Sequence, residues 1–221
     1  MNRQQMARAI DHTLLKPEAT PGDIERLCRE ALAHHFAAVC VNAVFVPLAA
    51  RKLAGSDVAV GTVAGFPLGA TSTAIKATEA ELAIAKGATE IDMVMAVGLL
   101  KAGRDGAVRE DITAVAAVCH SQGALLKVII EAALLTEAEK VTACHICTQV
   151  GVDYVKTSTG FARGGATVED VALIHQAVGA AVGVKAAGGI HTYAEALRMI
   201  EAGATRIGAS RGVEILEGAP R

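Results

Sequence analysis

The fold is decided by a unit at residues 125–157, which reads LLKVIIEAALLTEAEKVTACHICTQVGVDYVKT. Short runs rich in Val, Leu and Ile open and close the unit, and the stretch between them has helical composition and spacing. Thr136 followed by Glu139 fits a capping box at a helix start, and Gly151 fits a helix end. The unit therefore predicts a strand, a helix and a second strand, which run parallel when they share one sheet.

The same alternation repeats along the chain of 221 residues. Three further Thr-x-x-acid patterns begin expected helices, at Thr20/Asp23, Thr167/Asp170 and Thr192/Glu195. The expected strands are Ile10–Leu14, Ala37–Val41, Val58–Val63, Glu90–Val94, Leu125–Ile130, Asp153–Thr157, Val182–Ala186 and Thr205–Ala209.

Eight units in this length fit a closed (β/α)8 barrel, the TIM-barrel architecture. We expect one domain over residues 1–221, with an extra short helix at the N-terminus. The alternative is an open doubly wound sheet. It is disfavoured because the chain has neither a G-x-G-x-x-G motif after an early strand nor a P-loop.

Composition excludes several classes of protein. Apolar residues form 52% of the chain and charged residues 20%, which excludes disorder. The formal net charge is −2, no basic block is present and Trp is absent, so we expect no nucleic-acid partner. The uncharged run 58–75 is as long as a membrane span, but its glycines and proline indicate a strand and a loop, so we expect no membrane partner.

The five cysteines are an odd number in a chain large enough to fold without disulfides. Together with a charged N-terminus that lacks a signal-peptide core, they predict reduced thiols and a cytoplasmic location. Cys144 and Cys147 form a single C-x-x-C inside a helical pattern, which indicates packed thiols rather than a zinc or redox site.

Charged residues interrupt strands that should be apolar on both faces. Lys127, Lys156 and Lys185 lie on three consecutive strands, at what we expect to be similar depth, and Asp92 and Asp11 interrupt two others. Removing such groups from water costs several kcal/mol unless they are paired. The alternatives are a set of salt bridges that brace the interior, or a functional site at the C-terminal mouth of the barrel.

Two amines that converge in a buried site predict a specific chemistry. Desolvation and like-charge repulsion lower a lysine pKa, and the neutral amine then forms an imine with a carbonyl compound. A carboxylate such as Asp92 would move protons in that reaction. The chain has no H-x-H or H-E-x-x-H motif, so we expect neither a metal nor a cofactor.

Three backbone-rich segments follow the last three strands: Ser158-Thr159-Gly160, Gly188-Gly189-Ile190 and Gly208-Ala209-Ser210. Backbone N–H groups in such loops bind phosphate, and barrels often place a phosphate site after strands seven and eight. The alternative is that these glycines only form tight turns. A further segment, residues 65–69 (GFPLG), is expected to form another loop at the mouth.

Several motifs together resemble the deoxyribose-phosphate aldolase family of imine-forming (class I) aldolases. They are the segments 11–15 (DHTLL), 40–42 (CVN), 65–69 (GFPLG), 127–131 (KVIIE), 153–161 (DYVKTSTGF) and 185–190 (KAAGGI). The VKTSTG stretch is the most specific of them. Two positions depart from the family pattern, Ala43 where Pro is frequent and Ala209 where Thr is common, and they affect loop detail rather than the lysine pair.

The resemblance implies a (β/α)8 barrel that reversibly cleaves 2-deoxy-D-ribose 5-phosphate to D-glyceraldehyde 3-phosphate and acetaldehyde. It implies a Schiff base on Lys156, with Lys185 lowering the pKa of that amine and Asp92 as acid/base partner. The substrate-binding and phosphate-binding residues that it implies are Gly160, Gly188, Gly189, Ser210, Lys127, Asp11 and Cys40. It also suggests a homodimer.

Two other functions compete with this hypothesis. One is a phosphosugar isomerase or a metal-dependent aldolase on the same barrel, and the other is a phosphosugar-binding sensor. A sensor would need the phosphate loops but not three buried lysines, so the lysines favour the enzyme.

Overall fold

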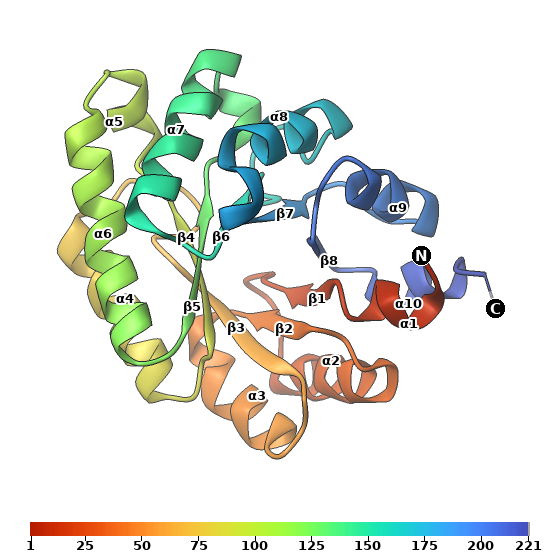
Figure 1. The fold of residues 1–221 in the computed structure, drawn as a ribbon. Helices are drawn as coiled ribbons and strands as arrows, with labels where there is room; N and C mark the ends of the chain where they lie inside the picture. Colours follow the sequence, from red (N-terminus) through yellow and green to blue (C-terminus); the bar gives the residue numbers. More distant parts are fainter. Residues whose placement is uncertain (221) are drawn as a thin grey trace.

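The computed structural model describes residues 1–220 and contains a closed parallel barrel in which each strand pairs with the next and β8 pairs with β1 (Figure 1). This confirms the predicted (β/α)8 fold. The strands are β1 (Ile10–Leu14), β2 (Ala38–Val41), β3 (Ala59–Ala64), β4 (Glu90–Val94), β5 (Leu125–Ile129), β6 (Tyr154–Lys156), β7 (Gly183–Ala187) and β8 (Arg206–Ala209).

Helices surround the barrel, and the first and last helices, α1 and α10, lie side by side (Figure 1). The α-helices are α1 (Arg3–Ala7), α2 (Pro21–His34), α3 (Val46–Leu53), α4 (Thr73–Ala85), α5 (Val97–Lys101), α6 (Asp105–Ser121), α7 (Glu137–Val150), α8 (Val168–Val178), α9 (Tyr193–Glu201) and α10 (Gly212–Glu217). Short 3-10 turns are η1 (Ala43–Phe45), η2 (Ala132–Leu134) and η3 (Gly179–Ala181). Helix α1 is the expected N-terminal helix.

The predicted helix starts are present, with one difference in detail. Thr20, Thr136 and Thr192 each form a complete capping box. Thr167 accepts a hydrogen bond from the backbone N–H of Asp170, but the reciprocal bond is missing. The reason is that the Asp170 carboxylate pairs with Lys140 of α7 instead.

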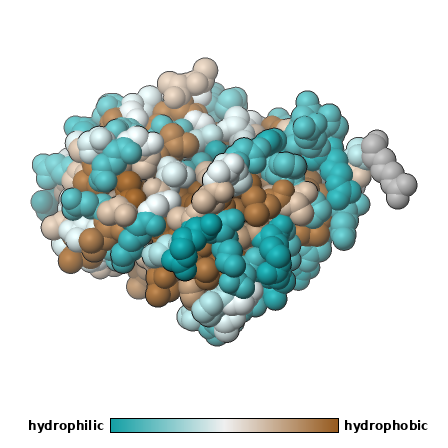
Figure 2. All heavy atoms as spheres, turned by 90° about the horizontal axis from the view of Figure 1, so that it is seen from below, coloured by the Kyte–Doolittle hydropathy of each residue, from teal (hydrophilic) through white to brown (hydrophobic). Residues whose placement is uncertain are grey.

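The apolar core lies between the barrel and its helices rather than inside the barrel. Outward-facing strand residues such as Ile91, Met93 and Val128 are fully buried against the helices. Hydrophilic and hydrophobic side chains are interspersed on the face in Figure 2. Among the residues described, none of the helices combines the length and apolar character that spanning a bilayer requires. The interior of the barrel is different, because charged side chains fill it.

Candidate active site

Lys156 and Lys185 face each other inside the barrel. They are direct register partners on β6 and β7. The Nζ atom of each lies 2.7 Å from the same atom, Oδ2 of Asp92 on β4. All three side chains are almost completely buried. The sequence placed these residues on inward faces, and the structure brings them into one cluster.

Lys127 of β5 joins the same cluster of charges. It is the register partner of Tyr154, two residues before Lys156, and it shares two carboxylates, those of Asp11 and Asp92, with Lys185. Its Nζ lies 2.6 Å from Glu90 Oε2, 2.8 Å from Asp92 Oδ1 and 3.4 Å from Asp11 Oδ2. Lys127 therefore takes the bracing role that was the alternative for these charges.

Arg206 of β8 also belongs to this ion-pair network, although it was not predicted as a site residue. Its guanidinium lies 2.6 Å from Asp11 Oδ1 and 3.3 Å from Glu90 Oε1, and it stacks over the Tyr154 ring. Asp11 also pairs with Lys185 at 2.5 Å. Glu90 was not predicted either, although the two-residue period of a strand could have identified it. Glu90 precedes the inward Asp92 by two residues on β4, so the two side chains share a face.

The cluster contains unequal numbers of acidic and basic side chains. It contains the carboxylates of Asp11, Glu90 and Asp92, and the cationic side chains of Lys127, Lys156, Lys185 and Arg206. Three negative groups balance three of the four positive groups. An excess buried charge is costly, so the cluster favours the loss of one proton.

The directions of the pKa shifts identify Lys156 as the group that loses it. Burial lowers the pKa of Lys156; Asp92 opposes this shift and the Lys185 ammonium adds to it, leaving the pKa below its usual value. Burial also acts on Lys185, but Asp11 and Asp92 outweigh it and raise the pKa. The carboxyl of Asp92 resists ionisation through burial, yet Lys127, Lys156 and Lys185 hold its pKa well below the ordinary range.

Cys40 lies on β2, directly beside this cluster. The side chain is buried, and burial raises the pKa of its thiol to about 11. It is therefore a neutral thiol at neutral pH. Cys144 and Cys147 are also free and buried within α7, as expected for packed thiols.

A cavity of about 380 Å³ opens above Lys156, and we call it the Lys156 cavity. Five of the predicted site residues line it: Lys156, Gly160, Gly188, Gly189 and Ser210. The other five are buried in the barrel and do not line it: Lys185, Asp92, Lys127, Asp11 and Cys40. The structure therefore separates the predicted set into a rim and a buried base.

The glycines at the rim have the geometry of an anion site. Gly160, Gly188 and Gly189 have φ values of 82°, 89° and 77°, where a side chain would be strained. Within residues 1–220 the backbone N–H groups of these three glycines have no acceptor. Unpaired N–H groups that converge on a cavity can bind phosphate oxygens.

Glu131 holds the β6–α8 loop and was not singled out as a site residue. Its buried carboxylate accepts hydrogen bonds from the backbone N–H of Thr159 at 3.2 Å and from its Oγ1 at 2.5 Å. Thr159 lines the Lys156 cavity and precedes Gly160. Sequence alone does not reveal this contact, because 28 residues separate the two partners.

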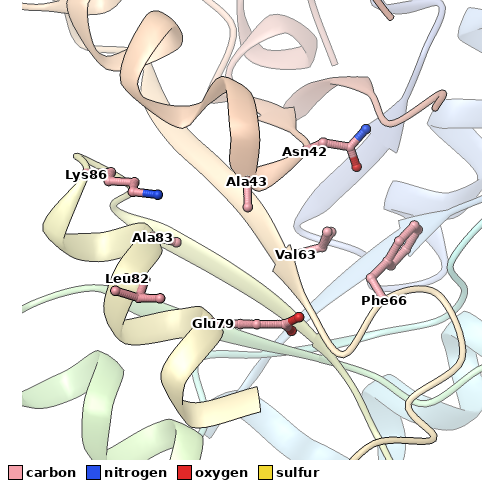
Figure 3. Close-up of a pocket in the computed structure, with 8 residues that line it drawn as sticks. All are labelled: Asn42, Ala43, Val63, Phe66, Glu79, Leu82, Ala83 and Lys86. Atoms are coloured by element: carbon pink, nitrogen blue, oxygen red, sulfur yellow. The ribbon is translucent and has the colours of Figure 1, made fainter. Parts of the chain in front are cut away.

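The loop at residues 65–69 lies at the mouth, as expected. The Phe66 ring packs edge-on against Phe161, with centroids 5.1 Å apart, and Phe161 lines the Lys156 cavity. Glu79 of α4 fixes the loop by accepting a hydrogen bond from the Gly65 N–H at 2.6 Å. Figure 3 shows Glu79 and Phe66 around a separate cavity of about 270 Å³, which contains none of the predicted site residues.

In the part of the chain that the structure describes, no group of three or more His, Cys, Asp or Glu side chains is arranged to hold a metal ion. The metal-independence expected from the sequence stays a prediction.

A parallel barrel with buried lysines beneath glycine loops is the architecture expected of an imine-forming aldolase. The chain belongs to the DeoC/LacD family of aldolases, whose family model matches residues 5–218.

Individual relatives are similar over nearly their whole length. A deoxyribose-phosphate aldolase from Thermococcus kodakarensis is 55% identical, over 100% of this chain and 99% of the relative. One from Actinobacillus succinogenes is 54% identical, over 99% and 96%. The solved structure of a deoxyribose phosphate aldolase from Aeropyrum pernix, described as tetrameric, superimposes with a TM-score of 0.92 at 33% identity, over 97% of this chain and 91% of that one.

Proposed function

We propose that the protein reversibly cleaves 2-deoxy-D-ribose 5-phosphate to D-glyceraldehyde 3-phosphate and acetaldehyde through a Schiff base on Lys156. The observation that carries the proposal is the position of Lys156. Its Nζ lies at the base of a cavity, in a cluster with one more cation than carboxylates. The names of the full-length relatives support the choice of substrate.

In the cleavage direction, the neutral Lys156 amine attacks the sugar aldehyde carbon, and loss of water gives a protonated imine. The bond between C2 and C3 of the sugar then breaks. Its electron pair moves toward the protonated imine and forms an enamine, while the C3 hydroxyl loses its proton and becomes the aldehyde of D-glyceraldehyde 3-phosphate. Protonation of the enamine carbon and addition of water release acetaldehyde and restore the amine.

Lys185 and Asp92 would manage protons in these steps. Asp92 contacts both lysine ammonium groups, so a proton can pass between Lys156 and Lys185 through its carboxylate. Because its pKa is held well below the ordinary range, Asp92 gives up a proton readily and serves as a relay rather than a store. At the rim, Gly160, Gly188, Gly189 and Ser210 would bind the substrate phosphate.

Asp11, Lys127 and Cys40 were predicted to bind substrate. We propose that they act through the cluster instead, because none of them lines the Lys156 cavity. Asp11 balances Lys185, and Lys127 balances Asp92 and Glu90. Cys40 contributes an uncharged surface beside them.

Trapping with borohydride tests the proposal. Acetaldehyde plus borohydride should add a stable ethyl group to Lys156, located by peptide mass spectrometry, and Lys156→Ala should lose both the adduct and the cleavage activity. An adduct on Lys185 would refute the assignment of roles. A metal-dependent aldolase or an isomerase would instead lose activity with a chelator and leave Lys156 unmodified. A sensor would bind phosphosugar without cleaving it.

We also propose that the protein forms a homodimer and resides in the cytoplasm. Light scattering coupled to size-exclusion chromatography tests the first statement, and cell fractionation tests the second.

A further inference from the structure

We propose that Lys16 is the cation that binds the substrate phosphate, and that it therefore determines the preference for phosphorylated over unphosphorylated sugars. This inference rests on the proposed function and adds to it a side-chain charge. The phosphate contacts considered so far are backbone N–H groups and one hydroxyl, whereas a phosphate ester carries close to two negative charges at neutral pH.

The residues that line the Lys156 cavity include three that can carry positive charge: Lys16, Lys156 and His191. None of the lining residues is an Asp or a Glu. Lys156 is committed to Asp92 and becomes the imine nitrogen during turnover. Lys16 is exposed at the rim, and a lysine ammonium binds phosphate as a compact point charge with three donors.

Lys16 lies on the same wall of the cavity as Ser210. A neighbouring cavity of about 500 Å³ is lined in part by His12, and we call it the His12 cavity. Lys16 and Ser210 line both cavities, so they form part of the wall that separates them. Ser210 follows β8, beside the loop that carries Gly188 and Gly189 after β7. Lys16 therefore borders the region where a phosphate on the glycine loops would lie.

Four acids line the His12 cavity, Asp23, Glu30, Glu214 and Glu217, and none of them forms an ion pair with Lys16 within residues 1–220. Asp23 pairs with Arg26 at 2.8 Å, and Glu30 pairs with His12 at 2.7 Å. Within residues 1–220, Nζ of Lys16 has no ion pair and no hydrogen-bond partner, and the hydrogen bonds of Lys16 are made by its carbonyl oxygen. Its charge is thus available to an anion in the Lys156 cavity.

The backbone of Lys16 is fixed although its side chain is free. Asn42 donates from Nδ2 to the carbonyl oxygens of Leu15 at 3.2 Å and Lys16 at 3.4 Å, and the Ala19 N–H donates to the Lys16 carbonyl at 3.2 Å. Figure 3 shows the Asn42 amide directed away from Lys86, which follows α4. These bonds hold the β1–α2 loop, so that Lys16 is presented at the rim at little further cost in backbone entropy.

The test compares Lys16→Met with Lys16→Arg, and with Lys86→Met as the matched control for loss of an exposed lysine. Substrates are 2-deoxyribose 5-phosphate and unphosphorylated 2-deoxyribose. Lys16→Met should lower kcat/KM for the phosphorylated sugar at least about tenfold, mainly through KM, because one charge-assisted contact is lost. It should leave kcat/KM for 2-deoxyribose within about twofold, because this sugar has no phosphate for Lys16 to bind. The contact is remote from the reacting carbon, so it contributes equally to binding of the substrate and of the transition state. Lys16→Arg should keep most of the preference, and Lys86→Met all of it.

A second measurement does not depend on turnover. Glycerol 3-phosphate has no carbonyl group and cannot form an imine, so its binding, followed by phosphorus NMR titration, reports the phosphate site alone. Lys16→Met should weaken it several-fold. Equal losses on both sugars, or unchanged binding of glycerol 3-phosphate, would overturn the role of Lys16. Failure of acetaldehyde trapping at Lys156 in the unmodified protein would instead count against the proposed function.

Discussion

Replacement of Lys185 by Met should slow the reaction much more at neutral pH than at high pH. The Nζ atoms of Lys156 and Lys185 each lie 2.7 Å from Asp92 Oδ2, so they are no more than about twice that distance apart. At an effective dielectric constant of about 20, two charges at such a separation repel by about 3 kcal/mol. Lys185→Met removes this repulsion, and the four cations of the cluster become three, which match its three carboxylates. The pKa of Lys156 therefore rises.

An energy of about 3 kcal/mol corresponds to about a 100-fold smaller fraction of neutral amine at a fixed pH below the pKa. We expect kcat/KM at pH 7 to fall by about 10- to 100-fold, and we expect this loss to shrink as the pH approaches 10. The assay is the initial rate of cleavage from pH 5 to 10, with circular dichroism as a check on folding. Lys185→Arg, which keeps the cation, serves as the control. A loss of equal size at every pH, or an unchanged profile, would refute the electrostatic role of Lys185.

Three further predictions follow from the buried charges. Asp92→Asn should lower the free energy of unfolding by about 3–5 kcal/mol, measured with urea at pH 7, because the buried ammonium groups of Lys127 and Lys185 lose their common carboxylate. A change below about 1 kcal/mol, the usual value for a surface pair, would contradict this. Folding lowers the pKa values of Asp11 and Asp92, so both carboxylates stabilise the protein above about pH 4. This stabilisation disappears as the pH falls further toward the folded-state pKa. Thermal unfolding measured against pH should therefore show a steeper loss of stability on the acid side for the unmodified protein than for Asp92→Asn. Cys40, with a thiol pKa of about 11 and little exposure, should resist iodoacetamide at pH 8 until the protein is denatured, and mass spectrometry of the native digest should show no modified Cys40.

Much of the fold could be predicted because its signals are local. A parallel strand covered on both faces gives a continuous apolar run, and helix caps require particular residues at fixed spacing. All eight strands occur within one residue of the expected bounds. The remaining differences arise where hydrogen bonding across the sheet ends, as at β6, which covers Tyr154–Lys156 instead of residues 153–157. That limit depends on neighbouring strands, which a single strand sequence does not describe.

The candidate site was only partly predictable for a related reason. Lys156, Lys185 and Asp92 interrupt apolar strands, so a charge in the wrong environment marks each of them. Glu90 and Arg206 stand at the first position of their strands, where a charged residue is ordinary and gives no such signal. Their burial results from closure of the barrel, which brings β8 beside β1 and Arg206 onto Asp11.

The ion pairs beneath Lys156 also determine how molecules can leave the protein. Because Arg206, Lys127 and their carboxylates fill the barrel interior beneath the reacting amine, molecules reach Lys156 through the passage at the glycine rim. On the proposed reaction, the two-carbon fragment stays bonded to Lys156 at the bottom of that passage, while the phosphorylated fragment sits nearer the exit. The products are therefore released in a fixed order: the triose phosphate leaves first, and acetaldehyde follows.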